Sequence, residues 1–442
     1  MISTTMFKKA ARGLAFAALL ALPAIAEAAP APTVNKGDTA WMLTSSLLVL
    51  LMILPGLALF YGGLVRTKNM LSVMTQVGAV AALTMLIWIG WGYTEAFGDG
   101  GNAFIAGFGK LFLKGVTPAT TAPTFTTGVA IPEYVFVCFQ MTFAAITIAL
   151  VLGSVVERMR FAAVMVFAAI WLTLVYFPIA HMVWGANGFF LTRGALDFAG
   201  GTVVHINSGV SALVACLVLG KRLGYPREAM MPHSLTMTGI GTGLLWVGWF
   251  GFNAGSALEA NGVAGLAMIN TFVATAAAGL VWMLAERLSG HKGSALGFCS
   301  GIVAGLVAVT PAAGNSGPLG AIVLGAIAAI VCFLAVSRLK PRLGYDDALD
   351  TFGIHGIGGM VGALGTGIVN DALVGGPANG GKTILAQLLV QGETVVATIV
   401  WAAAGTLIAV YAAKALTGLR VPQDREREGL DLAEHGERAY NY

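Results

Sequence analysis

Hydrophobic residues recur along this chain in long runs that are separated by short polar stretches. Beyond the first forty residues there are eleven such runs, and most of them reach the about 20 residues that a helix needs to cross a membrane. We therefore predict an all-α, polytopic membrane protein with eleven transmembrane helices. The predicted spans are 41–64, 70–94, 132–154, 161–184, 198–219, 234–256, 262–285, 294–312, 318–337, 351–370 and 393–416.

A shorter apolar run, over 14–25, stands apart at the start of the chain. Basic residues precede it and the small-x-small motif AEA follows it, which is typical of a secretory signal peptide and too short for a span. The predicted parts of the chain are a cleaved signal peptide, 1–28; a membrane domain, 29–417; and a polar tail, 418–442.

The charged residues of the loops orient the predicted spans. Only 10% of the chain is charged, and 57% is hydrophobic. Short cytoplasmic loops of membrane proteins are rich in Lys and Arg. We therefore place the basic loops and the C-terminus in the cytoplasm of a bacterial cell, and the mature N-terminus on the periplasmic side of its inner membrane. The net charge of +4 does not indicate nucleic-acid binding, because the basic residues belong to these loops. They are Arg66, Lys68, Arg158, Arg160, Lys221, Arg222, Arg227, Arg287, Lys292, Arg338, Lys340 and Arg342.

Two local patterns are assigned no chemistry. The four cysteines all fall inside predicted spans, so we interpret them as small buried residues and predict neither a disulfide framework nor a zinc site. The stretch over 376–383 fits G-x-x-x-x-G-K-T, but no strand precedes it and the topology places it outside the cell. We interpret it as a glycine-rich connector. The cysteines are Cys138, Cys216, Cys299 and Cys332.

Two histidines lie well inside predicted spans. His205 follows Asp197 by eight residues in the fifth span, and His355 follows Asp350 by five residues in the tenth. The two contexts are five spans apart, and an odd number of spans per repeat turns the second half upside down. We therefore predict an inverted five-helix repeat plus one C-terminal helix, with the histidines meeting near the midplane.

Ionisable groups at membrane depth suggest a functional site, but three interpretations of His205 and His355 are open at this point. Each could be a packing residue bonded to a neighbouring carbonyl. The two could be the axial ligands of a haem, which would make the chain an electron carrier or oxidoreductase. They could also line a pore.

Aromatic residues near the outer ends of three predicted spans favour a pore. Phe139 and Phe143 are spaced i, i+4 and share one face of the third span, Trp184 ends the fourth, and WFGFNAGS, 249–256, ends the sixth. An interfacial aromatic belt explains Trp249 easily. It explains Phe143 less well, because Phe143 falls deeper in its span.

Seven stretches spread over the chain form a combination of motifs: FYGGLVRTKN (60–69), FQMTFA (139–144), AHMVWG (180–185), LDFAGGTVVHINSG (196–209), GWFGFNAGSA (248–257), FGIHGIGG (352–359) and GLRVPQDREREGLDLAEHGERAY (418–440). Together they resemble the Amt/Mep/Rh ammonium transporter family, bacterial Amt branch, from about residue 36 to the end. The resemblance implies a homotrimer that transports ammonium for nitrogen utilisation, with one pore per subunit, no enzymatic activity, no cofactor and no metal.

The resemblance also implies roles for individual residues. Asp197 matches the aspartate that supports the outer site and is needed for transport, and His205 and His355 match the twin-histidine pair of the pore. Phe143 and Phe252 match two stacked rings that gate the pore. The residues that match the outer ammonium-binding site are Phe139, Phe143, Trp184 and Ser256.

A mechanism and two partners follow from this resemblance. Moving an unpaired ammonium-sized ion into an apolar pore is very costly, so we expect ammonium to be deprotonated near the outer site and ammonia to cross. The proton would cross through the histidine pair. The tail is implied to pack under the pores and couple the subunits, and a PII-type nitrogen regulatory protein is implied to bind the cytoplasmic face. Neutral transport and a sensor role are the open alternatives.

Overall fold

The computed structural model describes residues 32–377 and 380–440, so the predicted signal peptide lies outside the described residues. Eleven helical spans in the described part are long and apolar enough to cross a membrane, which confirms the predicted fold class. The spans are Lys36–Leu64, Thr67–Phe97, Glu133–Leu152, Phe161–Thr192, Gly201–Leu219, Leu235–Gly255, Gly262–Leu288, Ala295–Ala312, Pro318–Leu343, Phe352–Val369 and Ile384–Thr417.

Several spans combine α-helices with short π or 3-10 segments. The α-helices are α2 (Lys36–Leu51), α3 (Ala58–Leu64), α4 (Met70–Ile87), α5 (Tyr93–Phe97), α6 (Glu133–Leu152), α7 (Phe161–Trp171), α8 (Phe177–Trp184), α9 (Phe189–Arg193), α10 (Asn207–Leu219), α11 (Leu235–Gly255), α12 (Gly262–Leu288), α13 (Ala295–Val309), α14 (Pro318–Leu334), α15 (Lys340–Leu343), α16 (Ile357–Val369), α17 (Ile384–Thr417), α18 (Gln423–Glu428) and α19 (Leu430–His435). The π segments are η1 (Met52–Leu57), η3 (Trp88–Gly92), η5 (Leu172–Tyr176), η6 (Gly201–Ile206), η8 (Ala335–Leu339) and η9 (Phe352–Gly356). The 3-10 segments are η2 (Thr67–Asn69), η4 (Leu111–Leu113), η7 (Thr310–Ala312) and η10 (Ala372–Val374).

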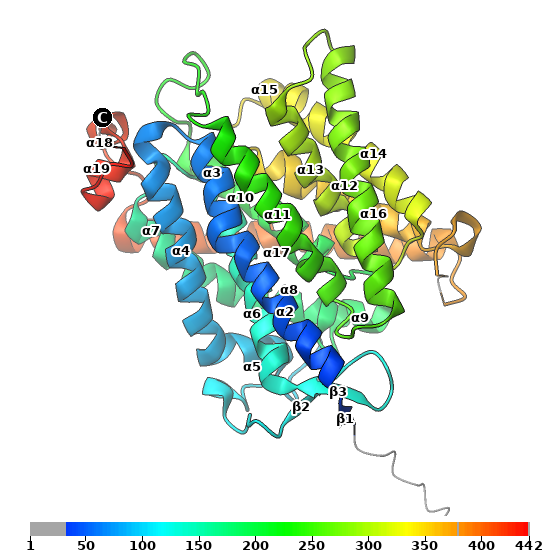
Figure 1. Cartoon of the computed structure of the whole chain (residues 1–442). Helices are drawn as coiled ribbons and strands as arrows, with labels where there is room; N and C mark the ends of the chain where they lie inside the picture. Colours follow the sequence, from blue (N-terminus) through cyan, green and yellow to red (C-terminus); the bar gives the residue numbers. More distant parts are fainter. Residues whose placement is uncertain (1–31, 378–379, 441–442) are drawn as a thin grey trace, which may run out of the picture.

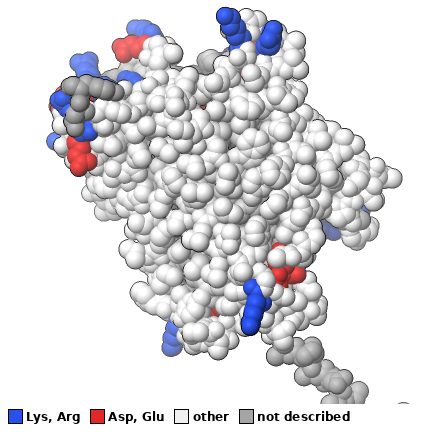
Figure 2. Space-filling model, viewed as in Figure 1, with Lys and Arg blue, Asp and Glu red and all other residues white. Residues whose placement is uncertain are grey.

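The spans form one bundle with charged groups at its two ends. Figure 2 shows blue and red atoms gathered at the top and bottom, with an uncharged belt between them. The helices α18 and α19 lie at one end, and the small sheet of β1 (Thr33–Val34), β3 (Val129–Pro132) and β2 (Thr121–Pro123) lies at the other (Figure 1). An uncharged belt of this kind is what the hydrocarbon layer requires.

The start of the eleventh span corrects the sequence prediction. It was predicted at residue 393, whereas α17 starts at Ile384. The prediction began too late because Gln387 and Gln391 lower the local hydropathy. Both side chains are buried, and Gln391 exchanges hydrogen bonds of 2.7 and 2.8 Å with the backbone N–H and carbonyl of Leu196. Internal partners of this kind allow polar residues inside a span.

Three of the four cysteines are buried, and the glycine-rich connector follows a 3-10 turn. Cys138 is exposed on α6 rather than buried, while Cys216, Cys299 and Cys332 are buried as predicted. Around the connector, the described residues contain η10 before the glycines and the start of α17 after them. A 3-10 turn in place of a strand does not form a phosphate-binding loop.

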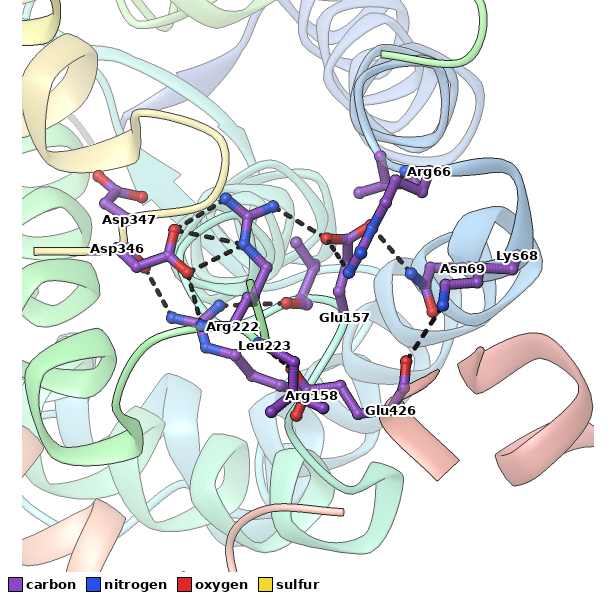
Figure 3. Close-up of polar contacts among 12 residues, drawn as sticks. Arg66, Lys68, Asn69, Glu157, Arg158, Arg222, Leu223, Asp346, Asp347 and Glu426 are labelled. Atoms are coloured by element: carbon purple, nitrogen blue, oxygen red, sulfur yellow. Dashed lines mark hydrogen bonds and ion pairs between the residues drawn. The ribbon is translucent and has the colours of Figure 1, made fainter. Parts of the chain in front are cut away.

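A cluster of buried charges joins several loops at the end of the bundle where the tail lies (Figure 3). Arg222 binds two carboxylates, at 2.9 Å from Glu157 and 2.8 Å from Asp346, and Arg66 binds Glu157 at 3.0 Å. Burial by itself would raise the pKa of Glu157, but Arg222 and Arg66 outweigh this effect and lower it to about 2. The loops that follow the first, third, fifth and ninth spans are thereby fixed to one another.

The tail packs against this cluster. The Glu426 carboxylate accepts from the backbone N–H of Leu223 at 2.8 Å, and the Asp431 carboxylate accepts from that of Ser72 at 2.7 Å. The backbone N–H of Leu430 donates to Asn69 at 2.8 Å. The described part of the tail is therefore anchored to the bundle rather than solvated along its length.

We expect Arg222→Met to destabilise the protein by about 3–5 kcal/mol, because it leaves the buried carboxylate of Asp346 without its partner and leaves Glu157 with Arg66 as its remaining arginine. The thermal unfolding midpoint of the purified protein measures this. The control is Arg227→Met in the same loop, where the arginine is exposed. Since the folded pKa of Glu157 lies below its unfolded value near 4.5, its contribution should be present above pH about 4.5 and disappear towards pH 2 in the parent protein. An unchanged midpoint in Arg222→Met would contradict the stabilising role of this cluster.

Candidate functional site

Three cavities lie along the bundle. The second and third share Phe60, Val303 and His355, whereas the first and second meet through the stacked rings of Phe143 and Phe252. The outer one, of about 540 Å³, is lined by Phe139, Phe143, Trp184 and Ser256. A constricted one of about 10 Å³ is lined by Phe252, His205 and His355. The third, of about 450 Å³, also reaches His355 and opens among residues of the buried-charge end, including Arg222 and Asp350. All the site residues predicted from the sequence, except Asp197, line this path.

Two stacked rings separate the outer cavity from the constriction. The Phe143 and Phe252 ring centroids are 4.2 Å apart with an interplanar angle of 16°. Phe143 also contacts Phe139 at 4.9 Å and Trp184 at 5.7 Å, both edge to face. The i, i+4 spacing of Phe139 and Phe143 on α6 thus brings both rings to one cavity, as the sequence predicted.

The two histidines meet below these rings. Nδ1 of His205 lies 3.2 Å from Nδ1 of His355, and both side chains are buried. A neutral imidazole has one donor and one acceptor nitrogen, so one ring donates to the other. Among the described residues, Nε2 of His205 has no hydrogen-bond partner. The pair therefore presents an unused polar atom at the constriction.

Each histidine lies in a π-helical turn that begins its span. His205 belongs to η6 and His355 to η9, and these two turns contact each other. The wider π turn occurs often at functional sites, where it redirects a side chain. Matching turns in the fifth and tenth spans agree with the predicted inverted repeat.

Asp197 lies beside the path and organises the start of η6. Its carboxylate accepts from the backbone N–H of Gly200 at 3.0 Å, Thr202 at 2.9 Å and Val203 at 3.0 Å. Its backbone carbonyl accepts from Nε1 of Trp184 at 2.8 Å. One residue thus caps the helix that holds His205 and fixes the indole of the outer cavity.

The counterpart of Asp197 in the second half is Asp347, which corrects the pairing made from the sequence. That pairing used Asp350, but Asp350 instead binds Nζ of Lys340 at 2.6 Å. Asp347 accepts from the backbone N–H of Phe352 at 2.7 Å, at the start of η9. It precedes His355 by eight residues, as Asp197 precedes His205, so the spacing alone identifies it.

Trp249 lines the constriction, and sequence reasoning missed it. It was compatible with an aromatic belt at the membrane surface, yet it is 1% exposed and stacks on His205 with centroids 5.4 Å apart. Its Nε1 donates to Oγ1 of Thr310 at 3.0 Å. It lines the constriction, so the indole fixes one face of the His205 ring.

A haem does not fit between the histidines. Axial ligands face each other across the iron and its macrocycle. Here the two rings are already within hydrogen-bond distance, and the cavity beside them measures only about 10 Å³. That volume is about what one water-sized molecule requires. The haem interpretation is therefore discarded on the geometry of these residues.

Comparisons with known proteins find related sequences along most of the chain. The sequence model of the Ammonium Transporter Family matches residues 40–440. A curated ammonium transporter from Aquifex aeolicus is 47% identical over 408 residues, which cover 92% of this chain and 94% of the relative.

Solved structures show the same fold. The crystal structure of Mep2 from Candida albicans superimposes with a TM-score of 0.80 and 36% identity, covering 88% of this chain and 87% of that one. A structure named Sensor Amt Protein superimposes with a TM-score of 0.83 and 27% identity, covering 90% and 98%.

Proposed function

Because this chain belongs to the Ammonium Transporter Family, we propose that it takes up ammonium at the outer cavity and passes ammonia and a proton separately to the cytoplasm. Membership of a transporter family supports transport rather than catalysis. The observation that carries the proposed route is the contact of His205 with His355 in a constriction that lies behind the stacked rings of the outer cavity and shares His355 with the third cavity.

Recruitment is assigned to the residues of the outer cavity that match the family. The rings of Phe139, Phe143 and Trp184 can each attract a cation by about 0.5–2 kcal/mol, depending on how far it is desolvated. The Ser256 hydroxyl donates to the carbonyl of Phe252 at 2.8 Å, so its lone pairs are free to accept from ammonium. Potassium offers no N–H donors, and this difference selects for ammonium.

Passage is assigned to Phe143, Phe252 and the histidine pair. The stacked rings must turn aside to admit a molecule, and the constriction beyond them accepts about one molecule of the size of water or ammonia. Ammonia can bond to Nε2 of His205, while the proton crosses along the two imidazoles and water. One charge then moves per ammonium, driven by the membrane potential.

Asp197 is assigned a supporting role rather than that of proton acceptor. Its two oxygens already accept three backbone N–H groups at the start of η6, so the carboxylate is engaged in holding that turn. Its field and its bond to Trp184 stabilise the recruitment site. Loss of a proton from ammonium is then assigned to the histidines and water below it.

The test is an ammonium pulse on proteoliposomes of the purified protein, with potassium as control. We expect a current with ammonium and none with potassium. Internal alkalinisation without current would make the pore a channel for neutral ammonia. If neither a current nor alkalinisation appeared, transport would be rejected. A sensor would then be favoured, a role that the name of one structural neighbour carries.

Trp184→Leu should raise the KM for the ammonium current by about two- to fivefold, since one exposed cation–π contact is worth about 0.5–1 kcal/mol. The loss is partial because Phe139 and Phe143 remain. The matched control is Trp401→Leu, because Trp401 also donates Nε1 to a carbonyl, that of Leu174 at 3.0 Å, but lies on α17 away from the cavities. An equal KM for the parent and Trp184→Leu would remove Trp184 from the recruitment site.

The cellular setting is part of the same proposal. Residues 1–28 would direct export, the domain 29–417 would lie in the bacterial inner membrane as a homotrimer, and the tail 418–442 would lie in the cytoplasm. A PII-type nitrogen regulator would insert a loop into the cavity of about 450 Å³ at that face. The anchored contacts of the tail, such as Glu426 with Leu223, support a preformed docking face.

A further inference from the structure

The outer cavity is far larger than the ion that it is proposed to recruit. Its volume of about 540 Å³ falls within the about 300–1,000 Å³ that small organic ligands occupy. A water molecule, which is close to ammonium in size, occupies only about 30 Å³ in the liquid. Ammonium at Trp184 therefore leaves most of this space unfilled.

One ring of the cavity lining is largely exposed to solvent. Phe125 lines the cavity and is 77% exposed, on the loop between β2 and β3. This loop is restrained, because both the backbone N–H and the hydroxyl of Thr126 donate to the Glu259 carboxylate, at 2.9 and 2.7 Å. A ring that lines the cavity from a restrained loop is available to contact a ligand held there.

The rest of the lining favours a cation with an apolar surface. Phe97, Phe136 and Phe198 add aromatic walls to those of Phe139, Phe143 and Trp184. Among the described residues that line the cavity, Asp99 is the one carboxylate, and neither lysine nor arginine is present. Nζ of Lys110 lies 3.4 Å from Asp99, but Lys110 does not line the cavity, and Asp99 remains 86% exposed.

We propose that the outer cavity also binds a bulky alkylated ammonium ion, of the quaternary class, with Phe125 as its outer wall. Aromatic surfaces on several sides are the surroundings in which quaternary ammonium groups are recognised. Such an ion is too large for the constriction of about 10 Å³ behind Phe143 and Phe252, so it stays outside and competes with ammonium. The inference rests on the proposed function, because both ions share Trp184.

Two measurements with tetramethylammonium test this site. The first is calorimetric titration of the detergent-purified protein, with tert-butanol as the neutral molecule of similar shape. The second is inhibition of the ammonium current by tetramethylammonium added to the outer side. We expect tetramethylammonium to bind and to inhibit competitively, and tert-butanol to do neither.

Phe125→Ala should raise the inhibition constant of tetramethylammonium by about two- to fivefold, and should change the KM for ammonium less than that. Phe108→Ala is the matched control, because Phe108 is a half-exposed ring in the outer loop that does not line the cavity. Its inhibition constant should equal that of the parent.

The outcomes separate this inference from the proposed function. Three results would overturn the quaternary-ammonium site and leave transport standing. They are an ammonium current that tetramethylammonium does not inhibit, binding of tert-butanol equal to that of tetramethylammonium, and an unchanged inhibition constant in Phe125→Ala. The opposite result is also possible. If the protein gave no ammonium flux but bound tetramethylammonium in the calorimeter, and Phe125→Ala weakened this binding, the site would be supported and the proposed function rejected.

Discussion

Replacing Asp197 by alanine is expected both to lower transport strongly and to destabilise the start of the fifth span. The carboxylate is 7% exposed and satisfies the N–H groups of Gly200, Thr202 and Val203. Each buried donor that is left unpaired costs about 1–3 kcal/mol. Because these groups begin the turn that holds His205, we expect the ammonium flux to fall by about 100-fold, as a displacement of about 1 Å can produce.

The measurements are the ammonium current and the thermal unfolding midpoint of the same preparation. Asp197→Asn keeps one acceptor oxygen and should give an intermediate midpoint. Asp371→Ala is the control, because Asp371 caps the surface turn η10 through Leu373 and should change neither quantity. A stable Asp197→Ala protein without flux would show instead that the carboxylate acts on the proton directly.

The eleven spans could be predicted from the sequence because hydropathy is a local property. Where the prediction was wrong, a contact distant in the chain decided the structure. The polar side chain of Gln391 lowers the hydropathy and so appears to interrupt the eleventh span, but its amide is hydrogen-bonded to the backbone of Leu196. The buried cluster of Glu157, Arg222 and Asp346 joins three loops that are far apart in the chain. Sequence reasoning used Arg222 only as a loop charge.

Prediction of the candidate site was limited in the same way, by contacts between residues that are distant in the chain. His205 and His355 were found because a histidine is conspicuous in an apolar run, and the repeat indicated that they meet. Trp249 was missed because a tryptophan near a span end is common at membrane surfaces, and only the fold brings its ring onto His205. Asp347 was missed because Asp350 lies nearer to the span, although the eight-residue spacing was available in the sequence.

We expect changes at the histidine pair to alter which ion crosses, beyond lowering the flux. His205→Asp would place a carboxylate at the constriction, against Trp249 and Phe252, where no solvent screens it. A carboxylate about 4 Å from a cation is worth about 4 kcal/mol at an effective dielectric constant of 20, or roughly a thousandfold in partition. The barrier that excludes potassium falls accordingly.

Potassium and ammonium pulses on proteoliposomes of His205→Asp measure this selectivity. We expect a potassium current that the parent protein lacks. The double variant His205→Ala with His355→Ala should lose the ammonium current, because both imidazoles of the proposed proton route are gone. His291→Ala, which removes an exposed loop histidine, serves as the control. If the double alanine protein carried the parent's ammonium current and still rejected potassium, the proton would have to cross by a route that avoids both rings. Ordered water past Trp249 would then have to carry it, and the contact between the two Nδ1 atoms would serve packing alone.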